Sequence, residues 1–354
     1  MSLTGFSRVG VLKLNYKKAA ILTALLSVLL CVTIVLPGCA PEKNAEPVPS
    51  PDINKKNSYT SASVEGGSQN GGSFLVCGTS GRLDRVFFDG TVENIPLDTY
   101  SDLTQVLISP DITLISGKSG TLLYSRDNAA FTRCDGAGKA DILGIAAYRG
   151  KYYAATGDGA ILSSENGVSW KANTRLTDKP IIAIEAQNLC IMAITADTDI
   201  FTSADGKDWA SQNYNEAYYG LMDPLAFRSL TGHEDAFILL AHLPGDEGSP
   251  VVMLSFDGGE LWSIPLTREI NDRPPEEFYP ITANAARYFG EVLLVACDRG
   301  RILTYTDCPS CNLITETTSG DFHCIAVKGD TILAAGDDYE FYILSGESLG
   351  TASG

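Results

Sequence analysis

Short apolar runs alternate with clusters of turn residues along most of the chain, and the runs have the length of β-strands. Between residues 74 and 345, stretches rich in Val, Ile, Leu and Tyr are separated by Gly, Asp, Asn and Ser. Three stretches lead into related motifs, "SENGVSW" (164–170), "SADGKDW" (203–209) and "SFDGGELW" (255–262). Because Asp-Gly and Asn-Gly favour tight hairpin turns, the pattern predicts many short antiparallel strands.

The turn motif recurs at a regular interval. Degenerate copies such as "FLVCGTSGRLDRVFFDG" (74–90) and "VLLVACDRGRILTYTDC" (292–308) follow the same plan. The acidic or amide anchors of all copies are Asp89, Asp127, Asn166, Asp205, Asp257, Asp307 and Glu347, spaced by 38, 39, 39, 52, 50 and 40 residues. Seven units of about 40 residues are typical of a β-propeller. We therefore expect an all-β, seven-bladed propeller of four-stranded antiparallel blades over residues 73–354.

The chemistry of the motif predicts a structural role. An Asp or Asn side chain accepts hydrogen bonds from nearby backbone amides, Gly accepts a positive φ, and the Trp side chain is large enough to pack between neighbouring sheets. The pattern resembles the Asp-box (BNR) repeat S-x-D-x-G-x-x-W of sialidases and of Ycf48-type photosystem II assembly factors. It matches best at Trp170, Trp209 and Trp262. The resemblance implies that the motif is a folding element and not a binding site.

The N-terminal segment predicts export. Four basic residues precede 18 uncharged residues (19–36), and "LPGC" ends at Cys39. This order is typical of a signal peptide and resembles a bacterial lipobox, which implies cleavage after residue 38 and a lipid on Cys39. An uncleaved membrane anchor is the alternative, and both place the rest of the chain outside the cytoplasm, lipid-anchored at the bacterial cell membrane in the favoured case.

The next segment predicts a tether. Residues 39–72 are rich in Pro, Ser, Asn and Gly, a composition that cannot bury a core. Blade 1 then lacks an innermost strand, because Phe74 already begins the second one. Either residues 57–65 or the segment after Ser345 could complete the ring.

Charge excludes one class of partner. Without residues 1–38 the chain has 22 basic and 43 acidic residues. A surface with this excess of negative charge repels phosphate backbones, so we expect no nucleic-acid binding. No cofactor is expected, and the protein is expected to be a monomer.

The cysteines leave three alternatives. "CPSC" places Cys308 and Cys311 at the Gly and Trp positions of one motif, where they could form a disulfide or remain reduced. A zinc site with His323 and Cys324 is the third, but adjacent residues of a strand point to opposite faces, so no metal is expected. The other cysteines in apolar strands are expected to be buried thiols.

The longer intervals of 52 and 50 residues between turn motifs indicate insertions, and these suggest where a ligand would bind. Three elaborations, 211–224, 243–250 and 267–280, are expected on one face beside blades 4–6, opposite the Asp-containing turns. Long loops on a rigid scaffold often carry binding residues. The candidates are aromatic or charged side chains: Tyr214, Tyr218, Tyr219, Asp246, Glu247, Arg273, Glu276, Glu277, Phe278 and Tyr279. The alternative is that these aromatic rings pack on the blades.

Three functions compete. We favour a non-enzymatic module that binds a protein or a cell-envelope polymer, with no catalytic residues. An assembly factor for a membrane complex is the second, implied by the Ycf48 resemblance. A sialidase-like glycoside hydrolase is the third, but the arginine cluster that such an enzyme needs for its substrate carboxylate is poorly supplied.

Overall fold

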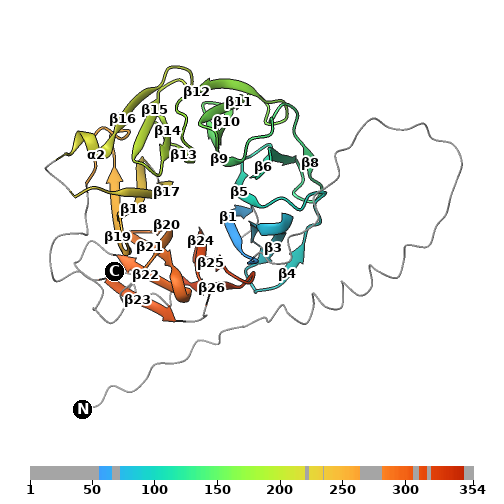
Figure 1. Ribbon diagram of the computed structural model, residues 1–354. Helices are drawn as coiled ribbons and strands as arrows, with labels where there is room; N and C mark the ends of the chain where they lie inside the picture. The colour runs from blue at the N-terminus through green and yellow to red at the C-terminus, as the bar shows by residue number, and fades with distance from the viewer. Residues whose placement is uncertain are drawn as a thin grey trace, which may run out of the picture. The chain divides into compact units, whose positions relative to one another are not determined.

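In the computed structural model, seven antiparallel β-sheets are arranged around a central axis, as in a β-propeller (Figure 1). The structure describes residues 56–65, 72–219, 223–233, 235–263, 281–305, 311–316 and 320–346. Five sheets have four strands, and the sheets of blades 5 and 7 have three strands within the described ranges. The expected seven-bladed all-β fold is confirmed.

In every blade the strands follow one another from the axis outward. Blades 1 to 4 contain β1 (Tyr59–Glu65), β2 (Ser73–Gly78), β3 (Leu83–Phe87) and β4 (Val92–Asn94); β5 (Leu103–Ile108), β6 (Thr113–Gly117), β7 (Thr121–Ser125) and β8 (Thr132–Arg133); β9 (Ile142–Tyr148), β10 (Lys151–Thr156), β11 (Ala160–Ser164) and β12 (Lys171–Arg175); and β13 (Ile181–Ala186), β14 (Ile191–Thr195), β15 (Asp199–Ser203) and β16 (Ala210–Asn213). Blades 5 to 7 contain β17 (Ala226–His233), β18 (Ala236–Leu243) and β19 (Asp246–Ser255); β20 (Ala283–Phe289), β21 (Val292–Cys297), β22 (Arg301–Tyr305) and β23 (Cys311–Glu316); and β24 (Phe322–Lys328), β25 (Thr331–Gly336) and β26 (Phe341–Ser345).

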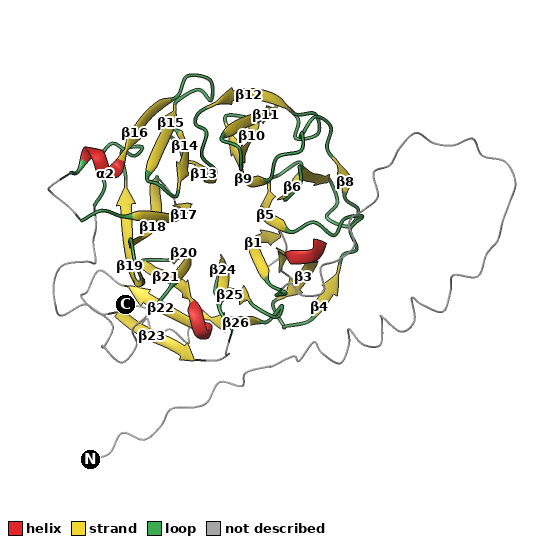
Figure 2. Cartoon of the chain, in the orientation of Figure 1, coloured by secondary structure: helices red, strands yellow, loops and turns green. Residues whose placement is uncertain are grey.

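Helical structure is minor in the described residues (Figure 2). It consists of the single turn α2 (Tyr214–Ala217) and the 3₁₀ turns η1 (Thr79–Gly81) and η3 (Asp298–Gly300). None of the helices in these ranges has the length and apolar composition needed to cross a membrane.

The apolar core lies between adjacent blades. Seven clusters of buried side chains each join two neighbouring sheets, as where Ile145 of β9 packs with Leu114 and Leu122 of blade 2. Both faces of the second strand of a blade are therefore covered, which is why β14 and β21 read as nearly continuous apolar runs.

The ring closes through β1. This strand pairs with β2 as the innermost strand of blade 1, and its Tyr59 packs with blade 7. The Asp338 amide donates to the Asn57 carbonyl at 2.8 Å. Residues 57–65 therefore supply the missing strand, and the predicted tether of 39–72 extends too far. The tether was predicted too long because β1 consists mostly of small or polar residues. Its sequence therefore resembles the Ser- and Gly-rich segments on either side.

Each blade presents two different sets of turns. Links between blades and the turns between second and third strands share the link face, where the Leu176 amide donates to the Gly159 carbonyl. Turns between first and second strands share the turn face with those between third and fourth strands. There the Tyr148 hydroxyl donates to the carbonyls of Leu189 (3.1 Å) and Ala204 (3.0 Å).

The Ser-Asp turns, centred on Asp127, Asn166, Asp205 and Asp257, lie on the turn face and share one geometry. In blade 3 the Asn166 Oδ1 accepts from the Ser164 hydroxyl (3.1 Å) and from the amides of Val168 and Ser169. The same bonds surround Asp127 and Asp205.

These turns also join neighbouring blades. The Asn173 amide of blade 3 donates to the Gly206 carbonyl of the next turn at 2.8 Å, and Gln212 of blade 4 donates to the Gly259 carbonyl at 2.8 Å. The Ser and Asp or Asn side chains bond within each turn, and the glycine carbonyls bond the neighbouring blade, so the turns serve the fold.

Candidate functional site

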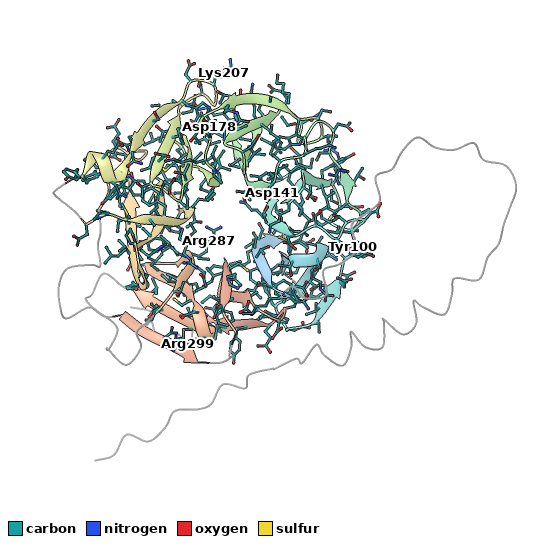
Figure 3. All side chains as sticks on the ribbon, in the orientation of Figure 1. Tyr100, Asp141, Asp178, Lys207, Arg287 and Arg299 are labelled. Carbon is teal, nitrogen blue, oxygen red and sulfur yellow. The ribbon has the colours of Figure 1, made fainter. Side chains whose placement is uncertain are left out.

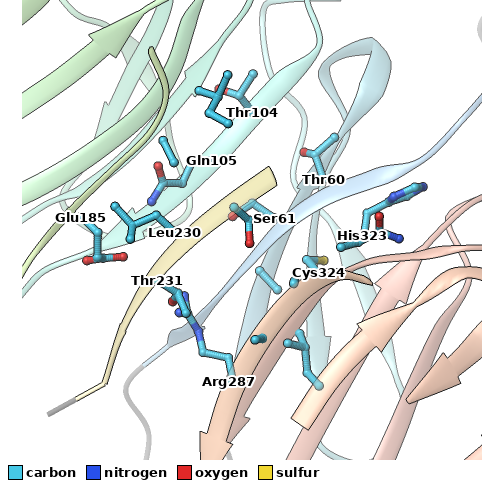
Figure 4. Close-up of a pocket in the computed structure, with 18 of the residues that line it drawn as sticks. Thr60, Ser61, Thr104, Gln105, Glu185, Leu230, Thr231, Arg287, His323 and Cys324 are labelled. Atoms are coloured by element: carbon cyan, nitrogen blue, oxygen red, sulfur yellow. The ribbon is translucent and has the colours of Figure 1, made fainter. Parts of the chain in front are cut away.

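The seven inner strands surround a central cavity of about 230 Å³. Every blade contributes to its wall (Figure 4). In Figure 3 the labels of Arg287 and Asp141 lie next to the axis, whereas those of Tyr100, Lys207 and Arg299 lie toward the periphery.

A bulge recurs near the start of every inner strand. One residue is left out of the pairing with the second strand in each blade: Thr60, Thr104, Leu143, Ile182, Arg228, Asn284 and His323. A bulge bends a strand and redirects its side chains. Because the bulge occurs in all seven strands, positions counted from it are equivalent around the axis.

Polar bulge residues bond from blade to blade. The Thr60 hydroxyl donates to the Leu103 carbonyl at 2.7 Å, and the Thr104 hydroxyl donates to the Ile142 carbonyl at 2.6 Å. In the same way, the Asn284 side-chain amide donates to the carbonyl of Phe322, the first residue of β24, at 2.7 Å. These three side chains are satisfied by the fold and form part of a rim at the link-face end of the cavity.

Three residues beyond the bulge, blades 4 to 6 differ from the others. Here β13, β17 and β20 carry Glu185, Thr231 and Arg287, which we call the channel triad. All three line the cavity. The equivalent residues of the other blades are Ser63, Leu107, Ala146 and Ala326. The polar character is thus concentrated on three consecutive inner strands.

The charges of the channel triad are held apart. Neither Glu185 nor Arg287 has an ion-pair partner within 4.0 Å among the described residues. Burial raises the pKa of the Glu185 carboxyl, while the charge of Arg287 and the amides of Ala186 and Gly232 act in the opposite direction. A Cβ at position 232 would clash with the Gln187 Nε2 and lie 3.3 Å from the Glu185 Cγ, so the glycine makes room for the side chains of both residues.

The predicted aromatic candidates divide between core and surface. Asn213 caps α2 by accepting from the Glu216 amide, and this turns Tyr214 inward against Phe227, where it is 2 % exposed. Tyr218 stacks on Tyr214 with ring centroids 4.6 Å apart. Tyr214 is therefore a core residue, as the packing alternative predicted, and of the three aromatic candidates that the structure describes only Tyr219, which is 89 % exposed, is presented to solvent.

The other predicted contacts are only partly described. The expected insertion at 243–250 is an extension of the hairpin β18–β19, with a two-residue turn. Asp246 and Glu247 lie in β19, but their side chains are outside the described part of the structure. The remaining candidates also lie outside it: Cys39, Arg273, Glu276, Glu277, Phe278 and Tyr279.

The cysteine and metal alternatives can be examined at His323 and Cys324. Cys324 is buried and bonds the Ala335 carbonyl, whereas the His323 Nε2 lies 3.0 Å from the Asp337 carboxylate. The two side chains thus have different partners, as expected for neighbours in a strand. Cys308, and the side chain of Cys311, lie outside the described residues, so their disulfide remains a prediction.

Asp321, His323 and Asp337 bring three ligand atoms within 4.8 Å of one another. The Asp337 carboxylate already bonds the Lys56 ammonium and the Asp321 amide. Although burial acts to raise the pKa of Asp337, these bonds and the one to His323 lower it. The Lys56 ammonium and these hydrogen bonds satisfy the carboxylate, so this cluster is a contact between residue 56 and blade 7 that helps to close the ring.

Sequence reasoning missed both the channel triad and an apolar patch on the turn face. The patch consists of Leu189 (54 % exposed), Phe256 (64 %) and Leu261 (70 %). It borders a groove of about 570 Å³ between blades 4 and 5, lined by Leu189 and Trp209 and by three carboxylates, Asp208, Asp257 and Glu260. The available signals were a charge inside an apolar strand and Phe256 inside a Ser-Asp turn.

Comparisons with known proteins support the fold. No family model matches the chain, and no curated protein matches its sequence. Ycf48 from Cyanidioschyzon merolae superposes with a TM-score of 0.61 at 14% identity, over 84% of this chain and 98% of that one. A Ycf48 bound to a D1 peptide gives 0.61 at 15% identity, over 86% and 99%. An inactive virginiamycin B lyase from Staphylococcus aureus, solved with quinupristin, gives 0.63 at 12% identity, over 84% and 97%. At such identities the chain shares their propeller fold, and its function has to be argued from its own surfaces.

Proposed function

We propose that the protein is a lipid-anchored, extracytoplasmic propeller without catalytic activity that binds another protein through the turn face of blades 4 and 5. The observation that carries the proposal is the apolar patch of Leu189, Phe256 and Leu261. Contiguous exposed apolar surface with a polar rim is characteristic of protein interaction sites. Three of the five exposed large apolar side chains in the described ranges belong to this patch.

The groove next to the patch favours a particular chemistry. Gly258 of the blade 5 turn lies close to blade 4, since a Cβ there would be 3.3 Å from the Cys190 sulfur and 3.9 Å from the Leu189 Cβ. Asp208 and Glu260 supply negative charge beside the Trp209 ring. The partner segment should therefore combine an apolar side chain for the patch with Lys or Arg for its rim.

Export and anchoring form the second part of the proposal. The signal-like segment and Cys39 support a lipid anchor at the outer surface of a bacterial cell membrane. A similarly folded Ycf48 has been solved with a D1 peptide, which supports a role in binding proteins, and assembly of a membrane complex is one form of that role. The Ser-Asp turns support membership of the Asp-box group of propellers.

Site-specific photo-cross-linking tests the docking face. A benzophenone amino acid at Phe256, on the turn face, is compared with one at Tyr219, a similarly exposed aromatic position beside α2. In membranes of the source cell we expect a discrete protein adduct at Phe256 and none at Tyr219. Adducts at Tyr219 alone would favour the link face predicted from the sequence. A polydisperse polymer adduct, or none at either position, would contradict the proposal.

Mass spectrometry of the membrane-extracted protein tests the anchor separately. The expected N-terminal peptide begins at a diacylglyceryl-modified Cys39. A protein that retains residues 1–38 would contradict lipidation and leave the uncleaved anchor.

A further inference from the structure

The channel triad is unusual because it places polar groups where the fold does not need them. Glu185, Thr231 and Arg287 occupy one register position on β13, β17 and β20. In blades 3 and 7 the same position holds Ala146 and Ala326, which are buried in the cores between blades. Five of the seven equivalent positions thus carry no charge, so the architecture itself does not require one here.

The Thr231 hydroxyl points to a missing partner. Thr231 is 7 % exposed, and its Oγ1 has no hydrogen-bond partner among the described residues. A buried polar group without a partner destabilises the folded protein. In Figure 4 the Arg287 side chain extends toward the strand that carries Thr231, with Glu185 on the far side of that strand. An anionic group held by Arg287 would supply the acceptor that this hydroxyl lacks.

The charges of the cavity wall specify the ligand further. Glu185 and Arg287 are the carboxylate and the guanidinium among the residues that line the cavity. They lie on strands separated by β17 and do not neutralise each other through an ion pair. Opposite charges held apart in a confined space are complementary to a molecule that carries both signs. The cavity of about 230 Å³ has room for a small molecule.

We propose that the channel triad binds a free α-amino acid, with the ligand carboxylate on Arg287 and Thr231 and its ammonium group on Glu185. The bound ligand completes the hydrogen bonding of Thr231 and gives each charge a partner. This site lies on the axis and is independent of the patch on the turn face, so either proposal can fail without the other.

Isothermal titration calorimetry of the purified full chain against each of the twenty amino acids tests the proposal. We expect at least one to bind with one-to-one stoichiometry. The N-acetyl derivative of that amino acid and the corresponding amine, which each lack one charge, should bind at least tenfold more weakly, since a hydrogen bond to a charged group contributes about 1.5–3 kcal/mol. Absence of binding by all twenty would overturn the proposal, as would equal binding of the N-acetyl form.

Variants connect the binding to the triad. Arg287→Gln and Glu185→Gln should each weaken binding at least tenfold, and Thr231→Val about two- to tenfold, as for a neutral hydrogen bond. Ser63→Ala, at the equivalent position of blade 1, is the matched control and should bind normally. In Glu185→Gln the free and N-acetylated ligands should bind equally, a readout that loss of structure cannot mimic. Normal binding by all three triad variants, or equal loss in Ser63→Ala, would overturn the site. Should the charge variants not fold, Thr231→Val and the ligand analogues on the wild type decide it.

Discussion

The three tryptophans that end the turn motifs look equivalent in the sequence, but the structure makes them unequal. Trp170 is 5 % exposed, and its indole Nε1 donates to the Gly167 carbonyl at 3.0 Å. Trp209 is partly exposed, and its Nε1 has no partner among the described residues. Replacing each by phenylalanine keeps an aromatic ring and removes the indole N–H. The two substitutions therefore separate the hydrogen bond from the bulk of the ring.

The expected magnitudes differ clearly. Trp170→Phe loses a buried hydrogen bond and leaves some space unfilled, so it should lower the free energy of unfolding by about 1–2 kcal/mol. Trp209→Phe removes a donor that has no acceptor, so its effect should stay within about 0.5 kcal/mol. Alanine extends the comparison, because Trp170→Ala should cost about 3–5 kcal/mol, whereas the partly exposed Trp209 loses less buried area.

Urea unfolding followed by far-ultraviolet circular dichroism measures these differences without relying on tryptophan fluorescence. Equal m-values across the variants would show that the surface exposed on unfolding is unchanged, so that midpoints report stability. If Trp209→Phe destabilised the protein as much as Trp170→Phe, the ranking by burial and hydrogen bonding would be refuted, and the turns would contribute equally despite their different packing.

Three further outcomes are expected. The backbone amides of Ala130 and Ala129, followed by the Ser125 hydroxyl, lower the pKa of Asp127 from 3.8 to about 2, so the contribution of this carboxylate to stability is complete above pH 3.8 and lost as the pH falls toward 2. Asp127→Asn, which copies the residue at position 166, should fold and should flatten this part of the pH–stability curve. An acid limb that is the same in the variant and the wild type would contradict this expectation. Burial raises the pKa of the Cys77 thiol to about 12 and also raises the pKa of the Cys324 thiol. An alkylating reagent should therefore modify both thiols only after unfolding, as peptide mapping would show. Labelling of either thiol in the native protein would show that these strands open. A protein truncated to begin at residue 73 lacks β1 and exposes the edge of β2, so it should aggregate or unfold. A protein that begins at residue 52 should give a single cooperative thermal unfolding transition. The same transition in both proteins would show that β1 is dispensable.

The blade count was predictable because one turn recurs at a nearly constant interval in several units. The anchors at Asp127, Asn166 and Asp205 fix a 39-residue period, and inter-blade bonds such as Asn173 to Gly206 require neighbouring turns to be arranged alike. Local chemistry therefore determined the global fold. Residues 57–65 could be predicted only as one of two candidates for the missing strand, because "YTSASVE" has few large apolar residues and its burial comes from the neighbouring blades.

The binding surfaces were less predictable for a different reason. Whether Tyr214 points to solvent or to the core depends on the single turn α2 and its Asn213 cap, which no periodic pattern reveals. Glu185 and Arg287 are visible as charges inside "IIAIEA" and "ANAARYF". Their equivalent positions around the axis, however, emerge only by counting from a bulge whose position is set by pairing with the second strand.

The position of the bulge also explains why three consecutive blades can diverge without loss of the ring. The rim bonds from Thr60 and Thr104, and the turn bonds from Asn173 and Gln212, hold neighbouring blades together at their inner and outer ends. The side chains in the middle of each inner strand are therefore not needed to hold the blades together. Polar residues at this level cost desolvation, but they break none of the bonds that fix the arrangement of the blades. A repeat architecture of this kind can thus change the chemistry of its axis blade by blade, while the turns that define the repeat stay the same.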